Sequence, residues 1–229
     1  MRLTMTGDDL RRARTSLGIS QVEAAARLGV SQTLLSLMEK GARSVTEAVA
    51  ENAVKALATG PELLPAAPDE RHDNDELAAD LGTLGYPGYR HLRGRLRNPG
   101  EVILDAIDRP DLDARLVEAL PWIPLHYPKI DWDWLTAQAK IRNRQNRLGF
   151  IVALAAKLAK GQSTRDVARQ LDQVEKTLED ARLAKADTLC QESWPPAQRR
   201  FARQRRTALA AHWKLDTRLS EVDLAYAAT

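Results

Sequence analysis

The sequence has almost no cysteine, few histidines and no long apolar run, and each absence excludes a class of protein. Cys190 is its one cysteine, so the chain can form neither an internal disulfide nor a cysteine-based zinc site. The four histidines are scattered, with no pair at metal-ligand spacing, and we predict no metal site and no cofactor. No segment offers the roughly 20 apolar residues that a membrane helix needs. The stretch after Met1, with Thr4, Thr6 and two aspartates, lacks the apolar core of a signal peptide, which predicts a cytoplasmic protein.

The chain also has little net charge. The formal value is +3 over 229 residues, but positive charge can still collect on one face of such a protein. Residues 60–114 are rich in acidic side chains, whereas residues 115–160 are basic, which indicates separate surfaces. The sequence has no glycine-rich phosphate loop and no nucleophile, base and acid arrangement, so we predict that the protein is not an enzyme.

The stretch SQVEAAARLGVSQTLLSLMEKG, residues 20–41, has the pattern of two short helices joined by a tight turn. Ser20 can cap the first helix, with Glu23 reaching back in a capping box. Gly29 suits the left-handed backbone of the turn, and Ser31 can cap the second helix. Small or apolar residues at helical spacing form the inner face: Ala24, Ala25, Leu28, Val30, Leu35 and Met38. This pattern predicts a helix-turn-helix, whose second helix enters the DNA major groove.

Helices are predicted on both sides of this pair. Thr6 can cap a first helix over residues 8–17, which ends at Gly18. Ser44 and Glu47 form a second capping-box pattern for a helix that runs to about Thr59.

Residues 8–59 resemble the Cro/C1 repressor (Xre) family of DNA-binding domains. The resemblance lies in LRRARTSLGISQVEAAARLGVSQ, then LLSLMEKGARS, then a final helix, and it covers about a quarter of the chain. It implies a four- or five-helix bundle that binds double-stranded operator DNA, usually as a two-fold homodimer.

The resemblance also implies DNA-binding roles for individual residues. Gln21 matches a phosphate-contacting position, and Lys40 and Arg43 match positions that anchor the DNA backbone. Gln32 is the best candidate for base reading, because an amide can donate to and accept from the edge of adenine. The full set of predicted DNA-binding residues is Gln21, Ser31, Gln32, Thr33, Ser36, Lys40 and Arg43.

Leu34 and Leu37 depart from the family, which normally carries polar residues on this outward helix face. Either they contact a thymine methyl group or protein covers them. We assign them to a partner-binding surface.

The remaining chain predicts a linker at 61–75 and a larger helical domain at 76–229. GPELLPAAPDERHDND has three prolines and many charges, which is typical of a linker. Beyond it, helices are expected at 99–107, 110–120, 131–141, 148–159, 163–189 and 195–212, and the proline-broken WIPLHYPKI is expected to be a loop. No segment alternates as a strand, so the fold class is all-α. The DNA-binding domain is placed at 1–60.

The densest basic cluster is KIRNRQNR, residues 140–147, just after the tryptophans of DWDW. Basic residues beside aromatics can bind single-stranded nucleic acid, although a charge run is more often a solvated face. A partner with an acidic surface is the third interpretation, and we assign Arg142, Arg144 and Arg147 to partner binding.

Short stretches of the second domain, YPGYRHLR, the DWDW helix and QNRLGF, resemble antitoxins encoded beside nucleotidyltransferase toxins of abortive-infection systems. The resemblance implies that the second domain neutralises a cognate toxin and that the chain represses its own operon.

Two alternatives remain open. Arg206 and His212, with five residues between them, resemble the ribonuclease motif of HEPN helical toxins. A ligand-sensing repressor would instead need an apolar cavity lined by the tryptophans.

Overall fold

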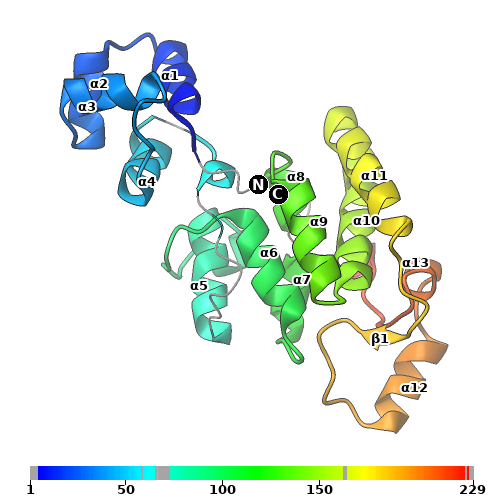
Figure 1. Ribbon diagram of the computed structural model, residues 1–229. Helices are drawn as coiled ribbons and strands as arrows, with labels where there is room; N and C mark the ends of the chain where they lie inside the picture. The colour runs from blue at the N-terminus through cyan, green and yellow to red at the C-terminus, as the bar shows by residue number, and fades with distance from the viewer. Residues whose placement is uncertain are drawn as a thin grey trace. The chain divides into compact units, whose positions relative to one another are not determined.

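Helices form nearly all the regular structure of the chain (Figure 1), which confirms the all-α prediction. The computed structural model describes residues 5–57, 59–64, 66, 73–161, 164–224 and 226. These fall into two units: unit 1 draws on residues 1–67 and 96–98, and unit 2 on residues 68–95 and 99–229. Within the described ranges the only sheet pairs β1 (Asp187–Thr188) with β2 (Leu215–Asp216) in parallel.

Among the described residues, unit 1 has four short α-helices, each started by a hydroxyl side chain. They are α1 (Gly7–Ser16), α2 (Gln21–Leu28), α3 (Gln32–Glu39) and α4 (Glu47–Ala56), followed by the short 3-10 helix η1 (Pro61–Leu63). Thr6 forms a reciprocal capping box with Asp9, and Ser20 and Ser31 accept from backbone N–H groups as predicted. The predicted capping box at Ser20 is only half formed, because the Glu23 carboxylate accepts from Arg27 instead of returning to Ser20. The predicted cap of α4 is wrong: Thr46, not Ser44, accepts from the backbone of Val49.

Apolar residues from all four helices form the core of unit 1. Its fully buried members include Leu10, Leu28, Leu35, Met38 and Leu57. Gly29 has a φ of 71°, which places it in the left-handed region that the turn between α2 and α3 requires.

The first part of the predicted linker belongs to unit 1. Leu64 is buried in the unit's core, and the backbone N–H of Met5 donates to the carbonyl of Leu63 at 2.8 Å. Asn98, from the returning segment 96–98, donates its amide to the carbonyls of Glu62 (2.9 Å) and Leu64 (2.7 Å). Residues 67–72 lie outside the described residues, so the structure does not test the linker prediction for them.

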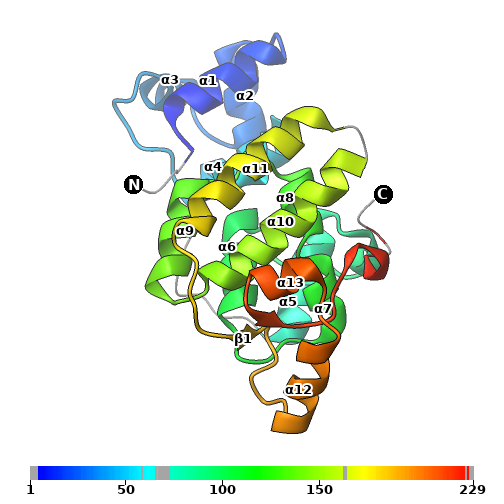
Figure 2. The same cartoon turned by 90° about the vertical axis from the view of Figure 1, so that its right-hand side faces the viewer.

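Unit 2 is organised around α10, whose residues from Gln145 to Ala156 are all buried. Helix α10 lies along α11 and contacts α8, α9 and α13 (Figure 2). The elements of the unit are α5 (Asn74–Leu84), η2 (Pro87–Tyr89), α6 (Pro99–Asp108), α7 (Ala114–Ala119), α8 (Trp122–His126), α9 (Trp132–Ile141), α10 (Gln145–Gly161), α11 (Arg165–Glu179), α12 (Pro196–Gln204), α13 (Ala208–His212) and η3 (Glu221–Asp223).

Gly149 lets α10 and Trp213 approach each other closely. A Cβ atom at Gly149 would lie 2.2 Å from the indole ring of Trp213, which is itself fully buried. The core therefore has no room for a methyl group at this point.

Three predicted segments differ in unit 2. WIPLHYPKI is not all loop, because Pro124 lies in the first turn of α8, where its missing N–H is not needed. The predicted helix 195–212 is two helices, since Thr207 caps α13 and accepts from Ala210. Helix α11 ends at Glu179, well before residue 189. Among the described residues, no helix has the length and apolar content to cross a membrane.

Candidate nucleic-acid interface

Helices α2 and α3 of unit 1 meet at the Gly29 turn and expose the beginning of α3. The backbone N–H of Val30 donates to the carbonyl of Ala25 at 3.0 Å and closes the turn. Gln32 and Thr33, in the first turn of α3, are both exposed. A helix whose first turn is free in this way can present side chains to base edges.

A buried carboxylate holds the helices of unit 1 in register. The Glu39 side chain is only 3% exposed and accepts from Arg14 through both oxygens, at 2.7 Å and 3.0 Å. It also accepts from Gln21 Nε2 at 2.8 Å. The sequence interpretation missed Glu39, although it follows Leu35 by four residues and therefore shares its inward helix face.

These hydrogen bonds keep Glu39 ionised. Burial by itself would raise the pKa of the carboxyl, but hydrogen bonds from Arg14 and Gln21 and the charge of Arg14 outweigh burial, so the pKa lies below its ordinary value. The same contact raises the pKa of Arg14. The pair is therefore a fixed charge pair at neutral pH.

The network continues from Glu39 to the predicted base reader. Gln21 Oε1 accepts from Gln32 Nε2 at 2.9 Å, so the chain of contacts runs from Arg14 through Glu39 and Gln21 to Gln32. This contact restrains the amide of Gln32 before any ligand arrives. Ordering a side chain in advance lowers the entropy lost on binding.

The other predicted DNA-binding residues lie around the same end of unit 1. The Ser31 hydroxyl caps α3, because it accepts from the backbone N–H of Leu34 at 3.2 Å. Ser36 is half-buried, whereas Lys40 and Arg43 are exposed beyond the end of α3.

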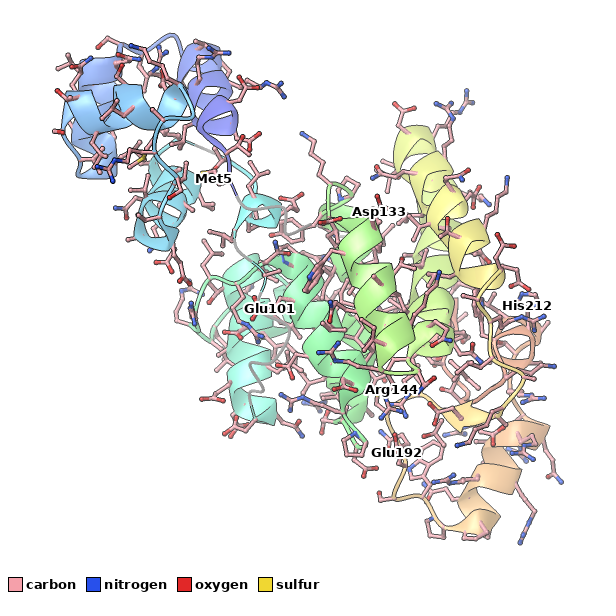
Figure 3. All side chains as sticks on the ribbon, in the orientation of Figure 1. Met5, Glu101, Asp133, Arg144, Glu192 and His212 are labelled. Atoms are coloured by element: carbon pink, nitrogen blue, oxygen red, sulfur yellow. The ribbon has the colours of Figure 1, made fainter. Side chains whose placement is uncertain are left out.

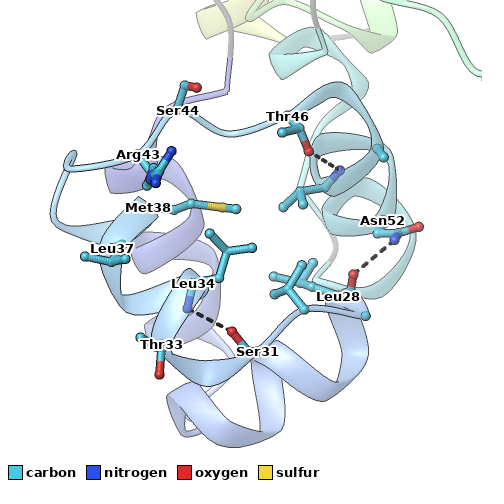
Figure 4. A pocket seen from close by; sticks show the side chains of 14 residues that line it. Leu28, Ser31, Thr33, Leu34, Leu37, Met38, Arg43, Ser44, Thr46 and Asn52 are labelled. Carbon is cyan, nitrogen blue, oxygen red and sulfur yellow. Dashed lines mark hydrogen bonds between the residues drawn. The ribbon is translucent and has the colours of Figure 1, made fainter.

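Leu34 and Leu37 flank a groove between α3 and α4 (Figure 4). The groove has a volume of about 590 Å³, and its apolar lining includes Leu28, Met38 and Val49. Leu34 is half-buried and packs on the core of unit 1, while Leu37 is 37% exposed at the groove edge. Of the two departures from the family, Leu37 is therefore the more accessible side chain.

The basic cluster at 140–147 pairs with carboxylates inside unit 2. Arg144 Nη1 lies 2.9 Å from Glu192 Oε1 (Figure 3), and its Nε lies 3.4 Å from Asp108 Oδ1. Arg142 shares Asp108, at 3.6 Å. Ion pairing leaves little of this charge for a partner.

Arg147 is fully buried and every part of its guanidinium has a partner. It binds Asp187 at 2.8 Å and 3.1 Å and Glu192 at 2.7 Å, and its Nη1 donates to the carbonyls of Ile107 and Arg109. A side chain with no exposed surface cannot contact a protein partner. The assignment of Arg147 to partner binding is therefore wrong, and this residue stabilises the fold instead.

Cys190 lies against the same guanidinium, with its Sγ 3.7 Å from Arg147 Nη1. Burial raises the pKa of the Cys190 thiol to about 11, although the charge of Arg147 opposes this. The thiol is therefore protonated and unreactive at neutral pH.

Arg206 and His212 do not converge on a common site. Arg206 Nη1 lies 3.3 Å from the buried carboxylate of Asp216, whereas His212 Nε2 (labelled in Figure 3) lies 2.6 Å from Glu179. The two residues also belong to different segments, because α12 ends at Gln204. Nothing in this geometry supports the ribonuclease alternative.

Two tryptophans of unit 2 lie in its core, and a third lines a pocket together with charged residues. A pocket of about 410 Å³ includes Trp194, but Glu118, Arg218 and Asp223 also line it. Trp122 and Trp213 are packed in the core. The described residues also hold no group of three or more side chains placed to bind a metal ion.

Comparison with known proteins gives one match. Curated proteins and solved structures show no match to the chain. Residues 7–67 match the family model described as a helix-turn-helix domain. The match supports a DNA-binding regulator and confirms, for this part of the chain, the resemblance found in the sequence: the N-terminal segment is a helix-turn-helix domain of the Xre-like type.

Proposed function

We propose that the protein is a transcriptional regulator in which unit 1 binds operator DNA as a homodimer and unit 2 binds a protein partner. Helix α3 would enter the major groove, with Gln32 and Thr33 at base edges and Lys40 and Arg43 at phosphates. A two-fold dimer would present its two α3 helices about 34 Å apart to a palindromic site.

The observation that carries this proposal is the Gln21–Gln32 hydrogen bond. It uses one N–H of the Gln32 amide and leaves that side chain exposed at the start of α3. The amide can still donate its second N–H to N7 of adenine, and its oxygen can accept from the N6 amino group. Glu39, which accepts from Gln21, ties this arrangement to the core of unit 1.

Gln32→Ala is expected to weaken binding to the specific operator by about 1 to 3 kcal/mol and to relax the preference at one base position. A mobility-shift titration on the promoter of the protein's own operon measures the change. Gln173→Ala, which removes an exposed glutamine from α11 of unit 2, is the matched control and should bind as the native chain does. Equal affinity of the two variants for the operator would remove Gln32 from the interface.

Replacing Lys40 and Arg43 together with alanine should weaken binding to all duplexes equally. Both side chains are exposed, and each phosphate contact contributes about 0.9 to the slope of log affinity against log salt concentration. The slope should therefore become less steep by about 2, with base preference unchanged. A change in base preference instead would place these two residues at base edges.

For unit 2 we propose the antitoxin role, in which toxin binding tunes repression of the operon. The support is the resemblance of YPGYRHLR, the DWDW helix and QNRLGF. Co-expression with the adjacent gene tests it: the native chain should restore growth that the neighbour's product arrests. Growth arrest caused by this chain alone, and abolished by His212→Ala, would favour the enzyme alternative.

A further inference from the structure

Helix α12 and the residues after it are rich in arginine, and the helix has very little packing of its own. Ala202 is its one buried residue, and Figures 1 and 2 both show the helix at the edge of the unit. Between Glu192 and Asp216 the sequence contains no acidic residue, while it has six lysines and arginines: Arg199, Arg200, Arg203, Arg205, Arg206 and Lys214. A nine-residue helix with so little burial is marginal without a further contact.

Part of this charge is used to hold α12 in place. Arg203 forms a two-point contact with the buried carboxylate of Asp216, at 2.7 Å and 2.9 Å, and Arg206 approaches the same group. Arg199 donates to the carbonyls of Trp194 and Glu192. These three arginines dock the helix onto unit 2.

The rest of the charge has no carboxylate partner. Arg200, Arg205 and Arg218 are exposed and form no ion pair with any residue that the structure describes. Arg205 and Arg218 lie over the ring of Phe201, at 4.4 Å and 5.6 Å from its centroid, so the exposed ring holds two guanidinium groups close together. Positive charges this close together repel each other, and a bound anion offsets that repulsion.

The contrast with residues 140–147 shows why α12 is the better anion site. In that cluster Asp108, Asp187 and Glu192 neutralise the arginines. At α12 the carboxylate that forms ion pairs, among the residues that the structure describes, is that of Asp216, and it is taken by Arg203 and Arg206.

We propose that the exposed face of α12, with Arg200, Arg205 and Arg218, is a second DNA-binding surface that contacts the phosphate backbone of a duplex. Guanidinium groups suit phosphates because their planar N–H groups match phosphate oxygens in pairs. A duplex is favoured over a single strand because guanidinium groups already cover Phe201, and a base would have to displace one of them to stack on the ring. The contact reads no sequence; it adds affinity to any duplex.

The test measures binding of the full chain to a labelled 30-base-pair duplex without an operator, by fluorescence anisotropy over a series of salt concentrations. The triple variant Arg200→Ala, Arg205→Ala, Arg218→Ala should bind at least about tenfold more weakly at low salt. Its slope against log salt should be less steep by about 2 to 3, since each lost phosphate contact removes about 0.9. Arg203 and Arg206 are kept, so that α12 remains docked.

The matched control removes three other cations from unit 2: Arg90, Arg165 and Lys176. These are also exposed and form no ion pair within the described residues, so the control loses the same net charge. It should bind within about twofold of the native chain. A second variant with lysine at positions 200, 205 and 218 should recover most of the affinity and slope, and thermal unfolding of all variants reports whether the fold is intact.

Three results would overturn the proposal. The first is native affinity and slope in the triple alanine variant. The second is equal loss of duplex binding in the control, which would make the effect one of net charge alone. The third is loss of binding to polyglutamate or to single-stranded RNA with duplex binding unchanged, which would assign α12 to an acidic protein or to RNA. Gln32→Ala is measured on the operator and the triple variant on a duplex without an operator, so failure of this surface and failure of operator reading by unit 1 give different results.

Discussion

Arg147→Met is expected to lower the free energy of unfolding of unit 2 by about 3 kcal/mol, near the lower end of the range for breaking a buried ion pair. The methionine keeps much of the apolar stem, so the loss comes from groups left without a donor. These are the carbonyls of Ile107 and Arg109, whereas the carboxylates of Asp187 and Glu192 lose Arg147 but keep Arg144 nearby. The carboxylates retain some solvent contact, at 26% and 38% exposure, which limits the cost.

The measurement is urea unfolding followed by tryptophan fluorescence. All five tryptophans lie between residues 122 and 213, so this signal reports unit 2 alone. As a second readout, Cys190 should react faster with a thiol reagent in the variant, because the buried thiol becomes accessible when the unit opens. Arg169→Met is the control, since Arg169 is 80% exposed and pairs with an exposed Asp166; its unfolding midpoint should not change. A native midpoint in Arg147→Met would show that the network is dispensable.

The same arginines show where the sequence was misleading. KIRNRQNR has dense positive charge, and nothing near it in the sequence neutralises that charge. Its carboxylates come from Asp108, Asp187 and Glu192, 34 to 48 residues away from the arginines they bind. A run of positive charge in a sequence therefore predicts a positively charged binding surface only when the fold brings no carboxylates next to it.

Local signals were more reliable because their partners lie within four residues. Thr6, Ser20 and Ser31 cap helices as predicted, since a cap depends on the next three residues alone. The same rule gave the wrong cap for α4, because two hydroxyl residues, Ser44 and Thr46, stand close together before the helix.

The features of the candidate interface also fall into those that neighbouring residues predict and those that depend on distant residues. The turn at Gly29 and the exposed positions Gln32 and Thr33 follow from the pattern of the two helices. The Arg14–Glu39 pair does not, because its members are 25 residues apart. The division of residues 195–212 into two helices was also missed, since the amphipathic spacing continues across Thr207 and hides its role as a cap.

Glu39→Gln is expected to lower the free energy of unfolding of unit 1 by about 3 kcal/mol and leave unit 2 unchanged. Glutamine has nearly the shape of glutamate, but it leaves the Arg14 guanidinium without a countercharge while only 15% of that side chain is exposed. It also replaces one acceptor of the Gln21 amide by a donor, which disturbs the position of Gln32. Weaker operator binding should accompany the loss of stability.

The destabilisation should depend on pH in a defined direction. The pKa of Glu39 is lower in the folded chain than in the unfolded chain, so its ionisation stabilises unit 1 above the ordinary glutamate pKa of about 4.3. That contribution is full at neutral pH and is lost as the pH falls through the folded value. Glutamine does not titrate. The stability difference between the native chain and Glu39→Gln should therefore be constant near neutral pH and shrink below about pH 4.3.

Amide hydrogen exchange read by mass spectrometry on peptides from α1 to α4 measures this difference, after correction for the intrinsic exchange rate at each pH. Tryptophan fluorescence does not report it, because residues 1–85 contain no aromatic side chain. The control is Glu23→Gln, which breaks the exposed pair with Arg27 and should leave protection unchanged. The double variant Arg14→Met, Glu39→Met should be more stable than Glu39→Met alone, because it leaves no unpaired charge in the core. Strictly additive losses in this cycle would mean that the pair contributes no coupling, and that Gln21 and the apolar core alone hold α1, α2 and α3 together.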